Sequence, residues 1–245
     1  MKGIASEMKV FLSILFWIVM SVMTLLVFLA ALAIRIFLFP FDRKRKIAHA
    51  QGFWWGAAII GSNPFWGFSM SGIEHIDPKK TYIIVANHQS LADIIMLYKT
   101  RIQFKWVAKE SLFKIPIFGW CMSLMGYIKL TRGKFGSIKD SYFEASKWLR
   151  RGVSVLFFPE GTRSLDGKIN DFKNGAFKLA LQEQKSILPI RLEGSYDVLP
   201  KGSLIFKKRV SCRLTILPEI DTSSFPPEDF ALLREKTREA ISAAA

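Results

Sequence analysis

The stretch YIIVANHQSLADIIMLY, Tyr82 to Tyr98, joins a strand pattern directly to a helix pattern. The β-branched, apolar run YIIVA is typical of a buried strand, and the residues from Ser90 onward are typical of a helix. In α/β sheets, ligands bind where the strands end and the helices begin. His88 and Asp93 lie in this junction, so they are the first candidate site residues.

The sequence beyond about residue 72 repeats this alternation. It predicts strands at residues 82–86, 104–108, 127–130, 154–158, 188–192 and 210–217, and helices at residues 90–98, 136–150 and 174–181. A last helix pattern places Phe230, Leu233 and Ile241 on one face. Strands that alternate with helices favour an α/β fold with a mostly parallel central sheet flanked by helices.

The N-terminal part of the sequence is apolar. Residues 10–34 carry no charge, and this run exceeds the roughly 20 residues that cross the hydrocarbon core of a bilayer. A cleaved signal peptide would have a shorter apolar run, of roughly 7 to 15 residues. A second uncharged stretch, residues 47–73, is interrupted by GSNP. We therefore expect a hydrophobic helical hairpin over residues 1–70, spanning a membrane or lying in one leaflet, and an α/β domain over residues 71–245.

The chain is strongly basic, with a net charge of +15 over 245 residues. This excess favours an anionic partner such as nucleic acid, anionic lipid or a phosphorylated substrate. The tryptophans cluster in the hydrophobic N-terminal region rather than along a basic stripe, which argues against a nucleic-acid binder. Cys121 and Cys212 lack CxxC spacing, so we expect neither a metal site nor a disulfide framework.

The pair His88 and Asp93 has two interpretations. A histidine can accept a proton near neutral pH, and a carboxylate bound to its other ring nitrogen would fix the tautomer. Ser90 and Asp93 also form the pattern S-x-x-D, a capping box that begins a helix without any catalysis. The spacing alone leaves both interpretations open.

The motif FPEGTRS, residues 158–164, directly follows a predicted strand. Gly161 lets backbone amides approach an anion, Thr162 offers a hydroxyl, and Arg163 offers a planar fork that matches phosphate oxygens. Glu160 has the wrong sign for phosphate and would orient Arg163 or accept a hydrogen bond from a substrate hydroxyl. The motif predicts a phosphate-binding loop, and an exposed turn with a local ion pair is the alternative.

Four blocks, in this order, resemble the glycerolipid acyltransferase superfamily: NHQSLAD (87–93), GYIKLTR (126–132), FPEGTRS (158–164) and ILPIRLEG (187–194). Within the superfamily, the chain is most similar to the bacterial 1-acyl-sn-glycerol-3-phosphate acyltransferases. The segments VAKESLFKIPIFGW (107–120) and FKNGAF (172–177) also match, and the resemblance covers roughly residues 72–217. The second block lacks the acidic residue that many members carry before the arginine, which leaves the acceptor head group open.

The resemblance implies a reaction and a role for each motif. His88 would be the general base that deprotonates the free hydroxyl of lysophosphatidic acid, Asp93 would orient it, and the alkoxide would attack an acyl thioester directly. The residues expected to bind the glycerol phosphate are Arg132, Glu160, Gly161, Thr162 and Arg163. Lys105 and Lys109 are expected to meet the phosphate or the oxyanion, and Pro189 to shape the acyl or acceptor site.

The resemblance also implies the partners of the protein. The product would be phosphatidic acid, the co-substrate acyl-ACP or acyl-CoA, and no metal or other cofactor is expected. Because the acceptor lies in the bilayer, we expect the inner (cytoplasmic) membrane, with the catalytic domain on its cytosolic face. Two alternatives stay open: an acyltransferase or transacylase that acts on another lyso-lipid, and a membrane module that binds anionic lipid without turnover.

Overall fold

The computed structural model describes residues 2–63, 66–131, 133–198, 205 and 209–244. Within these residues the chain forms one seven-stranded sheet with the order β1-β7-β6-β2-β5-β3-β4. The strands are β1 (Trp66–Ser71), β2 (Ile83–Ala86), β3 (Phe104–Lys109), β4 (Ile128–Leu130), β5 (Ser154–Phe157), β6 (Ile187–Glu193) and β7 (Val210–Ile216). All six predicted strands are present, and their ends differ by at most one residue from the predicted ones.

The sheet is mostly parallel, as predicted. Strands β6, β2, β5, β3 and β4 run in one direction, whereas β7 is antiparallel to β6 and β1 is parallel to β7. The carboxyl ends of the five parallel strands therefore meet at one edge of the sheet. The helix that follows a parallel strand begins at this same edge.

Strand β1 was not predicted, because the sequence analysis placed its residues in the hydrophobic hairpin. WGFSMS carries no charge and only weak alternation, so its strand character depends on its partner β7, with Trp66 opposite Val210. A pairing between segments about 144 residues apart leaves no local signal in the sequence. The division into residues 1–70 and 71–245 stays a prediction.

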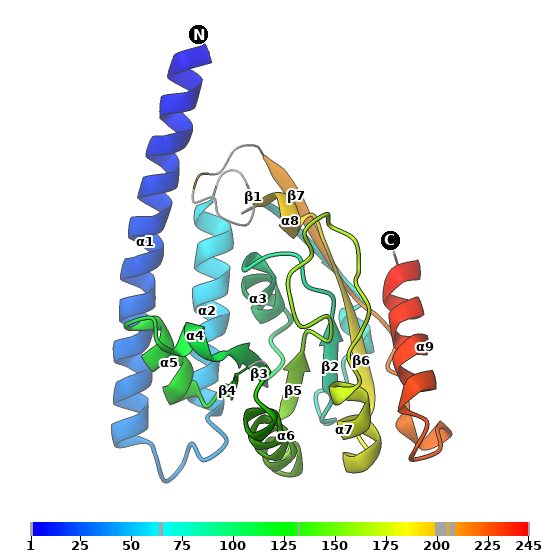
Figure 1. Cartoon of the computed structure of the whole chain (residues 1–245). Coiled ribbons are helices and arrows are strands. Elements are labelled where there is room, and N and C mark those ends of the chain that lie inside the picture. The colour runs from blue at the N-terminus through cyan, green and yellow to red at the C-terminus, as the bar shows by residue number, and fades with distance from the viewer. Residues whose placement is uncertain (1, 64–65, 132, 199–204, 206–208, 245) are drawn as a thin grey trace.

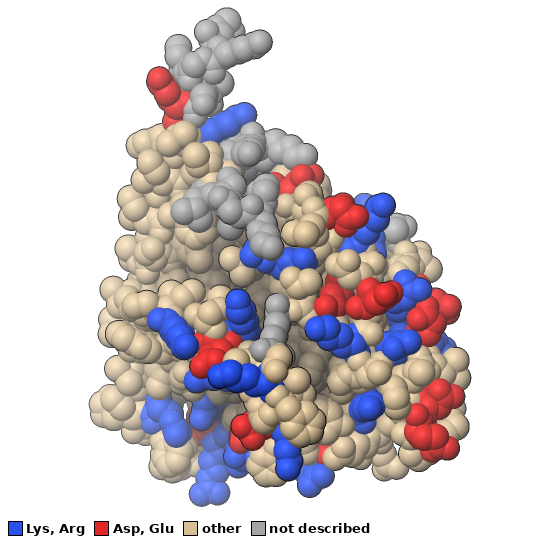
Figure 2. Space-filling view, in the orientation of Figure 1, with Lys and Arg blue, Asp and Glu red and all other residues tan. Residues whose placement is uncertain are grey.

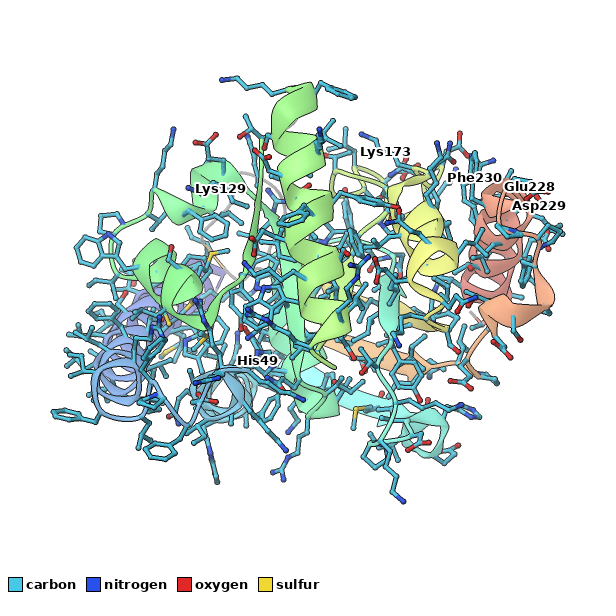
Figure 3. The ribbon with its side chains drawn as sticks, turned by 90° about the horizontal axis from the view of Figure 1, so that it is seen from below. His49, Lys129, Lys173, Glu228, Asp229 and Phe230 are labelled. Carbon is cyan, nitrogen blue, oxygen red and sulfur yellow. The ribbon has the colours of Figure 1, made fainter. Side chains whose placement is uncertain are left out.

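Helices cover both faces of the sheet (Figure 1). They are α1 (Lys2–Phe37), α2 (Lys46–Ser62), α3 (Ala92–Leu97), α4 (Glu110–Phe113), α5 (Phe118–Met125), α6 (Phe135–Arg150), α7 (Gly175–Glu183), α8 (Ser195–Val198) and α9 (Phe230–Ala243). Short 3₁₀ turns lie at Ile73–His75, Tyr98–Thr100 and Thr222–Ser224. The predicted helices are confirmed, and Figure 3 shows Glu228, Asp229 and Phe230 together where α9 begins.

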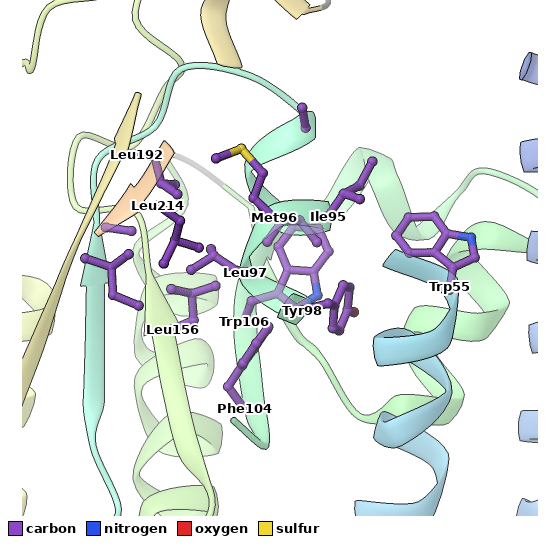
Figure 4. Close-up of a cluster of buried hydrophobic side chains, with 14 of the residues drawn as sticks. Trp55, Ile95, Met96, Leu97, Tyr98, Phe104, Trp106, Leu156, Leu192 and Leu214 are labelled. Carbon is purple, nitrogen blue, oxygen red and sulfur yellow. The ribbon is translucent and has the colours of Figure 1, made fainter. Parts of the chain in front are cut away.

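Alternating residues of β2 pack into two separate cores. Ile84 belongs to a cluster with Trp55, Phe104 and Leu156, which lies between the sheet and the α1, α2, α3 and α5 side; Figure 4 shows part of it. Ile83 points to the opposite face of the sheet and packs with the buried residues of α6, α7 and α9. Since each face of the sheet buries its own cluster, a shift of β2 by one residue would exchange the two sets, which fixes its register.

Helix α1 is long and apolar, as predicted, and packs against α2 and α5. Trp55 of α2 donates its indole N–H to Thr24 Oγ1 of α1 at 3.0 Å. The outer side of α1 exposes large apolar residues along its length, among them Phe11, Ile18 and Leu26. In Figure 2 this side of the molecule carries almost no charge. The segment Glu7–Phe37 is long and apolar enough to cross a membrane, which indicates membrane association.

Helix α2 packs tightly against the part of the chain that contains the sheet. A Cβ atom at Gly52 would lie 2.4 Å from Tyr98 Cε1, so only glycine allows this approach. His49 of α2 is completely buried, lies 3.2 Å by its Nδ1 from the Tyr127 hydroxyl, and projects from the helix into the molecule (Figure 3). Burial lowers the pKa of His49 to about 3, so its ring is neutral.

Lys105 of β3 gives the stability of this region a pH dependence. Burial, with a further contribution from Arg45, lowers its pKa from 10.5 to about 7, while Asp42 acts in the opposite direction. Below pH 7 the lysine is charged in both the folded and unfolded states. Between pH 7 and 10.5 the unfolded lysine holds a proton that the folded one has lost, so the free energy of unfolding rises with pH.

In the wild type this rise in the free energy of unfolding is at most about 1.4 kcal/mol per pH unit, and we expect Lys105→Met to abolish it. Thermal unfolding of both proteins in detergent at pH 7 and pH 9 measures this. The wild type should gain stability relative to the variant at pH 9. A difference in stability that is the same at both pH values would contradict the assignment.

Candidate active site

The candidate site lies at the carboxyl edge of the parallel strands, where β2 ends next to β6 and β5. Asn87, the first residue after β2, extends the sheet with its side chain. Its Nδ2 donates to the Leu192 carbonyl at 2.8 Å, and its Oδ1 accepts from the Leu192 N–H at 2.7 Å. These two bonds replace a backbone pairing with β6 and set the direction in which the chain enters His88.

His88 and Asp93 are in direct contact. The His88 Nδ1 lies 2.7 Å from Asp93 Oδ2. A carboxylate can only accept, so Nδ1 carries the proton and Nε2 of the neutral ring carries the lone pair. The ring stacks on Phe158, with centroids 4.0 Å apart and planes at 18°. Since the His88 side chain is 15% exposed and no described residue hydrogen-bonds to Nε2, this nitrogen is available to a substrate.

Asp93 serves the helix as well as the histidine. Its Oδ2 also accepts from the backbone N–H groups of Gln89 and Ser90, at 2.7 and 2.9 Å, and its Oδ1 accepts from the Ser195 hydroxyl. The side chain is completely buried. The carboxylate that caps the start of the helix is therefore also the one that orients the His88 ring. The capping box is present and is compatible with a catalytic His88, which stays a prediction.

Glu160 holds the backbone of His88. Its Oε1 accepts the His88 N–H at 2.6 Å, and its Oε2 accepts from the N–H and Nδ2 of Asn170 at 2.9 and 2.8 Å. The Ser164 N–H donates to the His88 carbonyl at 2.8 Å. Glu160 is 5% exposed, and burial raises its pKa. Among the described residues its carboxylate is not hydrogen-bonded to Arg163, and its bond to the His88 N–H gives it a positioning role. The expected contact of Glu160 with a substrate stays a prediction.

The loop that follows Glu160 has a glycine that lets other groups come close to its backbone. Gly161 has a positive φ of 73° and donates its N–H to the Phe158 carbonyl at 3.0 Å. A Cβ atom at Gly161 would lie 2.9 Å from Lys173 Nζ, so the lysine side chain covers this loop. Thr162 is exposed and Arg163 is half-buried. Lys173, which is labelled in Figure 3, lies two residues before α7 and brings a cation to the loop.

The structure describes three other predicted residues, which differ in whether they lie at this edge of the sheet. Lys109 ends β3 at the same edge and is exposed. Lys105 is a correction: it is completely buried and donates to the Met125 carbonyl at 2.7 Å, so the structure does not bring it to the site. Pro189 is buried within β6 opposite Val85, below the edge. Arg132 lies outside the described residues.

Sequence reasoning missed Ser195 and Asn170. Ser195 follows β6 by two positions and reaches Asp93 only because β6 lies next to β2 in the sheet. Asn170 reaches Glu160 through a loop of ten residues. The contact of Ser195 could be found only with a knowledge of strand order, and that of Asn170 only with the path of the loop after β5. Among the described residues, no group of three or more His, Cys, Asp and Glu side chains could hold a metal ion.

Residues 67–193 match the family described as Acyltransferase, which is just over half of the chain. The chain belongs to the acyltransferase family. The resemblance seen in the four sequence blocks is thereby confirmed. His88, Asp93 and the loop from Glu160 to Arg163 all lie inside the matched residues of this family.

Individual members of the family are similar over different lengths. The chain is 39% identical over 161 residues to the chloroplastic 1-acyl-sn-glycerol-3-phosphate acyltransferase LPAT1 of Arabidopsis thaliana, covering 65% of this chain and 45% of that protein. It is 35% identical over 153 residues to the 1-acyl-sn-glycerol-3-phosphate acyltransferase of Borreliella burgdorferi, covering 62% and 61%. The chain spans about half the length of the curated plant relatives it matches.

The fold agrees over nearly the whole chain with a solved structure of the family. The crystal structure of the 1-acyl-sn-glycerophosphate (LPA) acyltransferase PlsC from Thermotoga maritima superimposes with a TM-score of 0.84 at 27% sequence identity. The match covers 98% of this chain and 95% of that one, and therefore includes the N-terminal helices as well as the sheet.

Glu160→Gln tests whether the hydrogen bond from the His88 N–H to the Glu160 carboxylate matters for activity. The amide keeps one acceptor but turns an NH₂ group toward either the His88 or the Asn170 N–H, which leaves a buried donor unpaired at a cost of about 1 to 3 kcal/mol. We expect acyl transfer to fall at least about tenfold, since a small misplacement of a catalytic group is costly. Glu235→Gln, in an exposed pair with Arg238, is the control. Equal activity of the two variants would refute the positioning role of Glu160.

Proposed function

We propose that the protein transfers an acyl group from an acyl thioester to the free sn-2 hydroxyl of 1-acyl-glycerol-3-phosphate and so forms phosphatidic acid. The observation that carries this proposal is the buried Asp93 carboxylate on His88 Nδ1, which leaves Nε2 open at the edge of the sheet. Relatives that are similar to this chain are named 1-acyl-sn-glycerol-3-phosphate acyltransferases, which supports the proposal.

His88 would act as the general base. Its Nε2 takes the proton of the acceptor hydroxyl while the oxygen attacks the thioester carbonyl carbon. The tetrahedral intermediate then collapses, the carbon–sulfur bond breaks, and the sulfur leaves as a thiol with the proton that His88 returns. A positioned base supplies a factor of about 10² to 10⁴, and holding the two substrates together supplies roughly 7 to 11 kcal/mol. This route passes through no acyl-enzyme.

The phosphate of the acceptor would bind beside this base. Gly161, with its positive φ, allows the backbone to come close to an anion, and Thr162 and Arg163 offer a hydroxyl and a guanidinium. Lys109, at the same edge of the sheet, adds a positive charge. Arg132 follows β4, which ends at this edge too, and is proposed as a further ligand of the phosphate.

The proposal extends to the membrane and to the acyl donor. The apolar outer side of α1 would keep the protein at the bilayer that holds both the acceptor and the product. The net charge of +15 would strengthen contact with anionic lipid by about 1 kcal/mol for each lysine or arginine near the surface. We propose the inner (cytoplasmic) membrane with the catalytic part on its cytosolic face, and acyl-ACP or acyl-CoA as the donor.

The test is turnover by His88→Ala. Detergent-solubilised protein is incubated with lysophosphatidic acid and either acyl-CoA or acyl-ACP, and phosphatidic acid is quantified by mass spectrometry. Loss of the base should lower the rate by at least about 10²-fold. His75→Ala, in the 3₁₀ turn after β1, is the matched control and should keep the wild-type rate.

Other outcomes separate the alternatives. Product from other lyso-lipids but not from lysophosphatidic acid would show that the acceptor is another lyso-lipid. Product from a phospholipid donor alone would show that the protein is a transacylase. If neither wild type nor variant makes any product while both bind anionic vesicles, a lipid-binding module without turnover replaces the proposal.

A further inference from the structure

Ser195 lies beside the His88–Asp93 pair but outside the residues that match the family. It begins α8, directly after Gly194 and strand β6. Gly194 has a φ of 76°, and a Cβ atom there would lie 2.2 Å from the Ser211 carbonyl oxygen of the β7 region. The chain can therefore turn sharply at this glycine, and the turn buries Ser195 completely against Asp93.

The hydroxyl of Ser195 has two acceptors within reach. It donates to Asp93 Oδ1, and it lies 3.2 Å from Gln89 Oε1. A hydroxyl carries one proton, and the closer, charged oxygen receives it. The two Asp93 oxygens are thus divided: Oδ1 is bound by Ser195, and Oδ2 is bound by His88 Nδ1 and two backbone N–H groups.

We infer that Ser195 is a positioning residue for the acyl-transfer reaction: it holds the Asp93 carboxylate in the rotation that turns Oδ2 toward His88. This inference rests on the proposed function. Without the hydroxyl, Oδ1 would be a charged acceptor in a completely buried side chain with no donor among the described residues. The carboxylate would then rotate or admit water, and the orientation of the His88 ring would loosen.

The same segment braces the loop that follows the candidate phosphate-binding residues. Tyr196, next to Ser195, donates its hydroxyl to the Leu165 carbonyl at 2.7 Å. Gln89, between His88 and the helix, donates from Nε2 to the Gly167 carbonyl at 2.9 Å. Tyr196, after β6, and Gln89, next to His88, therefore both connect the surroundings of the His88–Asp93 pair to the loop around residues 165–167.

Ser195→Ala in the full chain is the test, in steady-state kinetics with lysophosphatidic acid and an acyl thioester. We expect kcat to fall about 10- to 100-fold, with the KM of both substrates within about twofold, because the variant disturbs the base rather than the substrate contacts. In an Asp93→Ala background the same substitution should have no further effect, since Ser195 acts through Asp93.

Ser146→Ala is the matched control. Ser146 of α6 is buried and donates to Glu183 Oε1 at 2.6 Å, so this variant also removes a hydroxyl bound to a carboxylate, on another part of the molecule. It should leave kcat unchanged. Thermal unfolding of both variants establishes that each is folded.

A substrate-free measurement keeps this inference separate from the proposed function. In ¹⁵N-histidine-labelled protein, the His88 Nδ1 proton should exchange faster with solvent in Ser195→Ala than in wild type or Ser146→Ala. Lack of turnover by the wild type would overturn the proposed function and leave this readout intact. Unchanged kcat with unchanged exchange, or an equal loss of kcat with and without Asp93, would overturn the role of Ser195.

Discussion

The carboxylate of Asp93 is the interaction on which the site depends. Four donors from two parts of the chain meet on it: the His88 ring and two backbone N–H groups of the helix start, and the Ser195 hydroxyl that follows β6. Because the side chain is completely buried, the loss of any one donor leaves a charged acceptor incompletely satisfied. The helix start, the His88 ring and the order of β2 and β6 therefore depend on one another.

The fold supplies the surroundings that this carboxylate needs. Parallel strands bring the ends of β2, β5 and β6 to one edge, so that residues more than 100 positions apart in the sequence contact Asp93. Glu160 repeats the arrangement on the other side of His88, where a buried carboxylate binds the His88 backbone and a distant loop. Two buried carboxylates thus fix one histidine, one through its ring and one through its main chain. Rigid support of this kind is what the general base of the proposed reaction requires.

The local part of this arrangement could be predicted from the sequence. The apolar run before His88 and the five-residue step to Asp93 are short-range patterns, and so is the charge-free length of α1. Contacts that depend on strand order could not be predicted. Strand β1 has only a weak strand pattern and is stabilised by its pairing with β7. The contact of Ser195 with Asp93 has no sequence signal, because it depends on β6 lying next to β2. Lys105 shows the opposite error: a cation expected to meet the phosphate or the oxyanion points into the interior, because strand residues alternate between the faces of the sheet.

The most direct test of the central claim is a comparison of turnover with thermal unfolding in Asp93→Asn. Asparagine can still accept the backbone N–H bonds that begin α3, but its amide group cannot accept both the His88 Nδ1–H and the Ser195 hydroxyl. Our account predicts a loss of about 10³- to 10⁴-fold in kcat, as for removal of an orienting carboxylate in other histidine-dependent enzymes, with a small change in the unfolding temperature. Near-normal turnover in a protein that unfolds at a clearly lower temperature would contradict it and would reduce Asp93 to a helix cap.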